Sequence, residues 1–435
     1  MTSFAGLRGT GSFGADERPK NFREMILFRN PNGTAPIFAL TSKMSKKTVD
    51  DPEFSWWDEP NDVVRLRVDG AVAQAGTTVV VDGVDPSAAS PGNSWGHGNN
   101  VVPGDLLLVE PSSDAAAWNP EIILVTANAA GADAAHRSLT VARGQLGTAA
   151  PSGNQSIPNN ATLLKIGNVN AEGTRAPMAA TRNPIKYSNL CQIFKNTYKV
   201  TGTAAKTRFR TGDPVKNDKR RKSFDHARDI ELSILYGRRS EGTGSTLAEG
   251  RETAVTGLPQ RTMGGLRQYI PSTILSSSAS MNTLLDAVST VFDWESPAGD
   301  ERLVFCGNGA LNAFNKAITQ RGATASSAFD RVQYKSDEMT YGTRFMRYRV
   351  PQGNLFLKVH PLMNRVPILN NAMFIIDPSC LKYVCVRGRD TRMMDNIQEN
   401  DEDAIRGQWM TECSIMVDKG GLTMKYIGAM NNLDA

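Results

Sequence analysis

The residue pattern that most resembles a ligand site is a glycine triplet near the N-terminus. Gly9, Gly11 and Gly14 have the spacing of the G-x-G-x-x-G turn, which places a dinucleotide pyrophosphate at a helix N-terminus. That chemistry needs a strand before the turn and a helix after it, and the surrounding sequence predicts neither. We therefore expect no nucleotide cofactor.

Metal chemistry is not predicted either. The histidines are far apart, at His97, His136, His226 and His360. The five cysteines are Cys191, Cys306, Cys380, Cys385 and Cys413. Cys380 and Cys385 do not have C-x-x-C spacing, and no second pair accompanies them as a zinc site would require. An odd number of cysteines, mostly in apolar runs, favours buried reduced thiols over a disulfide framework.

The densest group of carboxylates lies in the stretch QENDEDAIRG, at Glu399, Asp401, Glu402 and Asp403. Paired acids catalyse acid–base chemistry only where their environments split their pKa values. A charged stretch beside a glycine is more typical of a loop tip. With no catalytic constellation and no Walker-type phosphate loop elsewhere, the sequence predicts no enzyme activity.

The totals indicate a multidomain protein. A chain of 435 residues is too long for one simple core, and its hydrophobic fraction of 40% is normal for a globular protein. No apolar run approaches the ~20 residues of a membrane span, and no secretory signal is evident. The net charge of +5 does not indicate a general nucleic-acid-binding protein.

One long helix is predicted over residues 213–237. Asp213 is suited to cap it, Pro214 fits the first position, and Gly237 is expected to end it in a left-handed conformation. Its second half has an apolar face formed by Phe224, Ala227, Ile230, Ile234 and Leu235. Its first half is basic, with Lys216, Lys219, Arg220, Arg221 and Lys222. Positive charge is unfavourable near a helix N-terminus, so this half needs acidic neighbours unless it is a solvated face.

The sequence before the long helix predicts extended structure. Residues 35–59 and 184–207 have strand-like patterns and are suited to form two sides of a long hairpin. Between them, residues 63–166 are poor in charge and contain short β-type runs separated by turn signals. This pattern predicts a small all-β barrel or sandwich inserted into the hairpin.

The sequence after the long helix changes style near Ser280, where helices and strands begin to alternate. Helices are predicted to start at Ser280 and Asn308. Strands are predicted at 303–306, 344–350, 354–360, 372–376, 381–387, 409–417 and 422–427. The fold class indicated by the whole chain is α+β.

The order of these parts resembles the major capsid protein of tailed bacteriophages, the Hong Kong 97 phage coat fold that encapsulins share. More specifically, it resembles the subfamily with a β domain inserted in the extended loop. The N-terminal half contributes IFALTSKMSKKTVDDPEFSWWDE (37–59), EGTRAP (172–177), NLCQIFKNTYKVTGTA (189–204), RDIELSILYG (228–237) and GGLRQYI (264–270). The C-terminal half contributes GNLFLKVHPLMN (353–364), MFIIDPSCLKY (373–383), WMTECSIMV (409–417) and GLTMKYIG (421–428).

The resemblance implies names for the parts. They are an N-terminal arm (1–34), an extended loop (35–62 and 166–212), an inserted β domain (63–165), a peripheral domain with the spine helix (213–275 and 401–435) and an axial domain (276–400). No charge-rich helical segment precedes the arm, so a fused scaffold is expected to be absent or removed. Some relatives crosslink through Lys, Asn and a catalytic Glu. Glu412 occupies a comparable strand, but no Lys or Asn partner is assigned.

The function implied is that of a coat protein, self-assembled as pentamers and hexamers into the icosahedral head of a phage and enclosing double-stranded DNA. Expected partners are copies of itself, a portal, scaffold or decoration proteins where they exist, and DNA contacted without sequence specificity; no membrane is expected. The resemblance also implies that the protein assembles in the host bacterial cytoplasm and resides in the virion, in the phage head. The alternatives are an encapsulin-like compartment, another virion structural protein and, from a different class, a soluble enzyme.

Contacts between subunits are expected where the chain cannot bury its own apolar surface. An arm and a hairpin lose backbone entropy on ordering, which contacts with neighbouring copies offset. The candidates are Phe13, Phe22, Phe28, Phe54, Trp56, Trp57, Phe194, Lys219, Arg220, Arg221, Glu402 and Asp403.

The charged candidates give a testable pairing between the acidic loop and the basic helix turns of a neighbouring subunit. Reversing Glu402 and Asp403, or reversing Lys219, Arg220 and Arg221, should each prevent assembly, because like charges then face each other. Reversing both patches should restore shells visible by negative-stain microscopy. If the double reversal also fails to assemble, the pairing is wrong.

Overall fold

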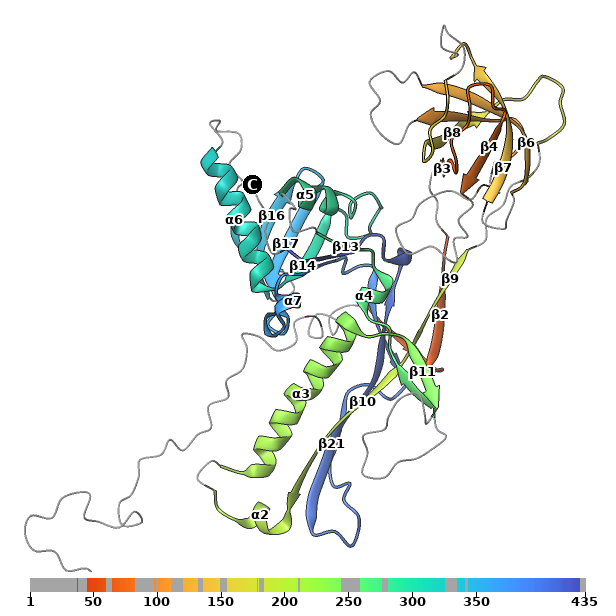
Figure 1. Ribbon diagram of the computed structural model, residues 1–435. Coiled ribbons are helices and arrows are strands. Elements are labelled where there is room, and N and C mark those ends of the chain that lie inside the picture. The colour runs from red at the N-terminus through yellow and green to blue at the C-terminus, as the bar shows by residue number, and fades with distance from the viewer. Residues whose placement is uncertain are drawn as a thin grey trace, which may run out of the picture.

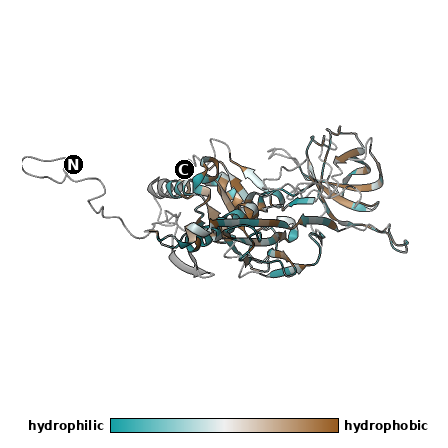
Figure 2. Cartoon of the chain, turned by 90° about the horizontal axis from the view of Figure 1, so that it is seen from below, coloured by the Kyte–Doolittle hydropathy of each residue, from teal (hydrophilic) through white to brown (hydrophobic). Residues whose placement is uncertain are grey.

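The computed structural model confirms the α+β class. It describes residues 37, 45–59, 65–82, 98, 101–110, 120–131, 136–148, 155–177, 179, 184–209, 212–243, 259–275, 281–324, 335–340 and 343–430. These residues form a body with two mixed sheets, two small two-stranded sheets and a separate β barrel (Figure 1). Hydrophobic residues lie along the strands of both the body and the barrel (Figure 2).

The first sheet of the body supports the long helix. Its strands are β1 (Lys46–Val49), β19 (Leu381–Val386), β20 (Arg392–Met394), β21 (Ala404–Val417) and β10 (Gln192–Thr201). The longest strand, β21, pairs antiparallel with the whole of β10 and, on its other side, with β19 and β20. In β10, Phe194, Tyr198 and Val200 alternate with exposed residues, as the sequence pattern predicts.

The long helix α3 (Pro214–Tyr236) packs on β10 and β21 and begins as predicted. The Asp213 side chain accepts hydrogen bonds from the backbone N–H groups of Val215 and Lys216, at 2.9 and 3.4 Å. The predicted left-handed end at Gly237 is wrong, because its φ is −54°. A glycine is needed there for close packing: a Cβ at Gly237 would lie 2.6 Å from the carbonyl oxygen of Met263.

Two short helices, α2 (Gly202–Lys206) and α4 (Leu266–Tyr269), contact α3. Between α3 and α4, the strands β11 (Ser240–Thr243) and β12 (Pro259–Thr262) form a small antiparallel sheet. The backbone N–H of Gly265, just before α4, donates to the carbonyl oxygen of Gly237 at 2.8 Å. This bond holds α4 against the end of the long helix.

The second sheet has seven strands. In order they are β13 (Ser272–Ile274), β22 (Lys425–Gly428), β18 (Met373–Ile376), β14 (Glu301–Cys306), β17 (Gly353–Val359), β16 (Thr343–Val350) and β15 (Lys335–Thr340). The helices of this half are α5 (Met281–Ser289), α6 (Asn308–Thr324) and the short α7 (Pro367–Asn370), with 3-10 turns at Met363–Arg365 and Lys419–Gly421. The predicted helices after Ser280 and at Asn308 are confirmed. The strands predicted in this half are also present, but the one predicted at 422–427 begins only at Lys425.

The two sheets exchange strands across the limits predicted from sequence. β19 lies within the predicted axial range yet pairs with β21 of the first sheet, and β22 lies within the predicted peripheral range yet joins the second. Of the two closing strands, β21 packs on the long helix as expected, whereas β22 pairs with β13 and β18 of the second sheet. The domain limits of the body therefore stay predictions.

The predicted hairpin forms over part of its length. β2 (Glu53–Asp58) pairs antiparallel with β9 (Ile185–Leu190), which makes a two-stranded ribbon. The following residues leave the ribbon, because β10 buries its apolar face in the first sheet under α3. In Figure 1 the barrel lies beyond one end of the ribbon.

The inserted domain is a closed barrel rather than a sandwich. Its strands run in the order β3 (Arg65–Arg67), β8 (Thr162–Asn168), β5 (Asp105–Glu110), β6 (Glu121–Ala130), β7 (His136–Gln145) and β4 (Thr78–Asp82). A bridge between Val68 and Val81 joins the first strand to the last. Valine, leucine, isoleucine and alanine fill the interior described here, which leaves the barrel packed in the same way as an ordinary core.

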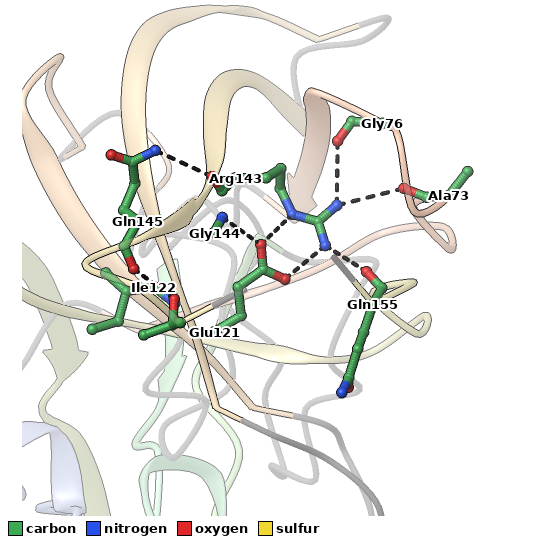
Figure 3. Close-up of polar contacts among 9 residues, drawn as sticks. Ala73, Gly76, Glu121, Ile122, Arg143, Gly144, Gln145 and Gln155 are labelled. Atoms are coloured by element: carbon green, nitrogen blue, oxygen red, sulfur yellow. Dashed lines mark hydrogen bonds and ion pairs between the residues drawn. The ribbon is translucent and has the colours of Figure 1, made fainter. Parts of the chain in front are cut away.

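A buried ion pair holds one end of the barrel (Figure 3). The Arg143 guanidinium donates two hydrogen bonds of 2.7 Å to the Glu121 carboxylate, and both side chains are only 3% exposed. The same guanidinium donates to the carbonyl oxygens of Ala73, Gly76 and Gln155. One arginine therefore fixes three segments around the strand ends of β6 and β7.

Breaking this pair should destabilise the barrel strongly. Arg143→Met leaves the Glu121 carboxylate buried without its charge partner, which costs about 3–5 kcal/mol. Hydrogen exchange of the β6 and β7 amides in the full chain should accelerate accordingly. Asp69→Asn is the matched control, because it removes an exposed contact with His136 in the same domain and should cost less than about 1 kcal/mol. If the two substitutions accelerated exchange equally, the Arg143–Glu121 pair would not have the stabilising role described here.

Candidate assembly surfaces

The basic half of α3 finds partners within its own chain. The Lys219 ammonium donates to Asp395 at 2.8 Å, and the Arg220 guanidinium lies 5.8 Å from the centre of the Phe224 ring. Lys219 and the Tyr198 hydroxyl both bond the Asp395 carboxylate and hold its pKa below the ordinary value. Arg220 and Arg221 are exposed. The predicted basic patch thus exists, but it is partly neutralised in one subunit.

The acidic loop also has a partner in its own chain. Glu402 forms an ion pair with Lys199 of β10, and the Asp403 carbonyl oxygen accepts a hydrogen bond of 3.1 Å from the backbone N–H of Gly202. The loop before β21 therefore lies beside α2, near the first turns of α3 (Figure 1). Pairing between neighbouring subunits stays a prediction, and it would have to compete with these internal contacts.

A polar network docks the middle of α3 on the first sheet. The two ring nitrogens of His226 lie 2.7 Å from the Asn196 side-chain oxygen of β10 and 2.7 Å from the Thr411 hydroxyl of β21. Asn196 also donates to Asp229 at 2.9 Å. Burial lowers the pKa of His226, against a smaller opposing effect of the Asp229 charge, so the ring is neutral in the folded protein.

A buried carboxylate joins α3 to two other parts of the chain. Glu231 and His360 have fully buried side chains, and His360 Nε2 lies 2.7 Å from Glu231 Oε1. The backbone N–H of Ile37 donates to the same oxygen at 2.8 Å. Ile37 is itself fully buried, which places this residue of the predicted extended loop against its own subunit. Sequence reasoning missed Glu231, because a glutamate in a helix usually faces water.

Three of the predicted contact aromatics are buried inside the chain. Phe54, Trp56 and Phe194 are 8%, 5% and 6% exposed, so the idea that they need a neighbouring copy for burial is wrong. The Trp56 indole N–H donates to the Val417 carbonyl oxygen at 3.0 Å, and its ring lies 6.0 Å from that of Tyr187. The ribbon strand β2 packs this face onto the body.

The opposite face of the ribbon presents Trp57. Its side chain is 62% exposed, and the Lys186 ammonium lies 5.9 Å from the centre of its ring. Trp57 is thus the aromatic candidate that the structure leaves available to a neighbour within the described chain. The other large apolar side chains that are exposed lie elsewhere in the described chain: Leu146, Ile166, Val169, Ile193, Phe209, Leu232, Ile274, Met346, Val366 and Ile368. Phe13, Phe22 and Phe28 lie outside the described residues.

The described residues offer little chemistry. Among them, no group of histidine, cysteine and acidic side chains could hold a metal ion. The five cysteines are buried and unpaired, and burial raises the pKa of Cys191 and Cys306 to about 12, so both stay protonated. The Glu412 carboxylate forms an ion pair with Arg389. Across this part of the chain, we find no helix that is both long and apolar enough for a membrane span.

The ribbon, the long helix, the two mixed sheets and the inserted barrel are the parts expected of the phage coat fold that the sequence resembles. A family model described as the SU10 major capsid protein matches residues 5–423. The chain therefore belongs to the SU10 family of major capsid proteins, and its place is the head of a phage virion.

The chain is also similar to individual proteins. The chain is 24% identical over 416 residues to a major capsid protein of Pseudomonas phage PaMx41, which covers 93% of this chain and 87% of that protein. A likeness to the capsid of a native GTA particle covers 98% of both chains, with 9% identity and a TM-score of 0.43. A likeness to an encapsulin complex from Synechococcus elongatus covers 59% of this chain and 79% of that one, with 11% identity and a TM-score of 0.38. The family assignment rests on the family model.

The polar network predicts that acid weakens the docking of α3. Because the folded pKa of His226 lies below its ordinary 6.5, the unfolded chain binds the proton more readily. The stability that neutral His226 contributes is present above about pH 6.5 and is lost as the pH falls further. The protection factors of the α3 amides, which correct hydrogen exchange for its intrinsic pH dependence, should therefore fall more between about pH 7.5 and pH 5 in the parent chain than in His226→Gln. A pH profile unchanged by the substitution would contradict this role.

Proposed function

We propose that many copies of this chain form a closed icosahedral wall around packaged double-stranded DNA, with no enzymatic step of its own. The observation that carries the proposal is the match of residues 5–423 to a major capsid family. The buried thiols, whose pKa values are raised, fit a structural role.

The distribution of charge supports a particular orientation of the wall. Residues 63–165 contain five basic and eight acidic residues, a net charge of −3. The rest of the chain contains 44 basic and 36 acidic residues, a net charge of +8. Phosphate attracts the basic part and repels the acidic part. We therefore propose that the barrel faces outward and that part of the body touches DNA without reading its sequence.

The parts of the chain have distinct roles in this proposal. Residues 1–34 act as an arm, and residues 35–62 and 166–212 as an extended loop that reaches a neighbour through the exposed face carrying Trp57. Residues 213–275 and 401–435 form a peripheral domain, and residues 276–400 form an axial domain near the five- and sixfold axes, with strands exchanged between the two. Repeated by symmetry, modest contacts hold a closed shell.

Further partners follow from the same proposal. A head that is filled with DNA needs a portal, and scaffold or decoration proteins are compatible with the exposed barrel. We propose that assembly takes place in the cytoplasm of the bacterial host. Contact with each of these partners is open to test with purified components.

The proposal is tested by expressing the chain alone. Closed shells or tubes are expected by negative-stain microscopy, because the contact surfaces belong to copies of the same chain. Particles recovered from an infected culture should protect DNA from nuclease. Discrete monomers or dimers of the expressed chain under all conditions would contradict the proposal, as would particles from the infected culture that do not protect DNA.

A deletion separates the barrel from the wall. Replacing residues 66–163 by a short linker should still permit assembly, because the body carries its own cores. The resulting shells should disassemble at a lower temperature if the barrel braces its neighbours. Arg143→Met is the comparison variant, since it loosens the barrel without removing it. Deletion shells that survive heating as well as the parent would exclude a bracing role.

A further inference from the structure

A turn at one end of the barrel has an unusual residue at its tip. The turn spans Gln145 to Thr148 and is closed by a hydrogen bond of 3.1 Å from the Thr148 backbone N–H to the Gln145 carbonyl oxygen. Both central residues have positive φ, +54° at Leu146 and +72° at Gly147. Turns with this backbone normally carry Asn-Gly or Gly-Gly, because a Cβ crowds the backbone in the left-handed region.

Leu146 stands apart from the other residues with this backbone. The remaining described non-glycine residues with positive φ are Asn160, Asn396, Lys419 and Ala429. Two of these are asparagines, which tolerate the conformation, and none is a large apolar residue. Leu146 is both in the left-handed region and 72% exposed. Neither turn preference nor packing within the chain accounts for a leucine at this position.

The turn is held rigidly. The Gly144 backbone N–H donates to Glu121 Oε1 at 2.9 Å, which ties the start of the turn to the buried Arg143–Glu121 pair (Figure 3). At its other end, the Thr148 hydroxyl donates to the Gln145 carbonyl oxygen at 2.7 Å and accepts from the Ile122 backbone N–H at 2.9 Å. A rigid support of this kind removes most of the ordering cost of a contact made by the tip.

The strand register places the turn far from the body. The barrel returns the chain toward β9 at the Asn168 end of β8, where Asn168 faces Asp105. The opposite end holds Glu110 opposite Thr162, and the next strands place Gln145 opposite Ile122 at that same end. The Leu146 turn is therefore at the distal end of the barrel, where the body of its own subunit does not cover it.

We propose that Leu146 is an anchor that docks on an apolar surface of a second copy of this chain. The inference rests on the proposed shell, because in a wall of identical subunits the neighbours of each barrel are other copies. The central residues of the turn, Leu146 and Gly147, are uncharged, and no atom lies within 4 Å of a Cβ placed on Gly147. An uncharged, protruding, rigid tip matches the desolvated centre of a protein interface rather than a nucleic acid or an ionic partner.

Leu146→Gly separates this role from a structural one. Glycine accepts the left-handed backbone, so the unassembled chain should keep or raise the melting temperature of its barrel. Assembled shells should release subunits about tenfold faster, because each copy loses one buried leucine. Ile166→Thr is the matched control: Ile166 is exposed in the same barrel, on β8, and its substitution should not change the release rate. Shells of Leu146→Gly that are as durable as the parent would overturn the proposal.

Photocrosslinking identifies the occupant. Benzoylphenylalanine placed at position 146 in shells formed by the expressed chain alone should, on irradiation, give covalent dimers of the chain in a denaturing gel, with the adduct mapped by mass spectrometry. Intact shells without dimers would overturn the contact while leaving the proposed function standing. A parent chain that forms no shells would count against the proposed function itself, and the contact would fall with it.

Discussion

A fully buried carboxylate is costly unless it is paired, and this constraint organises the body of the protein. Glu231 lies in the second half of α3 and accepts hydrogen bonds from the backbone of Ile37 and from the His360 ring. An unpaired charge at this depth would cost several kcal/mol, so the segments that carry Glu231, Ile37 and His360 must come together in this arrangement. The long helix is thereby joined to the second sheet, because His360 directly follows β17, and to the N-terminal part of the chain.

Local features of the fold could be predicted from the sequence, because they depend on neighbours a few residues away. Asp213 and Pro214 mark the start of α3, and the alternation of Phe194, Tyr198 and Val200 marks a half-buried strand. The failures involve distant partners. Gly237 is needed for its approach to the Met263 carbonyl, 26 residues later, and β22 pairs with strands far away in the chain. Local sequence patterns do not indicate which distant residues come into contact.

For the candidate contact residues too, the sequence indicates the residue type, whereas the tertiary structure decides exposure and partners. Composition identifies Phe54, Trp56 and Trp57 as apolar, but only the pairing of β2 with β9 decides which of them face the body. The two faces of the ribbon therefore differ in exposure, with Trp56 buried on one face and Trp57 exposed on the other. Lys219 and Glu402 were recognised by charge, and their internal partners Asp395 and Lys199 come from other elements. Leu146 could be found only from its backbone dihedral angle.

The closure of the inserted domain matters for a protein that exists at extreme local crowding. An open sheet has two edge strands whose free N–H and C=O groups invite strands from neighbouring molecules, which is a common route to aggregation. The bridge between Val68 and Val81 joins the first and last strands of the barrel, so that the ladder has no end. Many such domains can therefore lie close together in one shell without pairing into a continuous sheet.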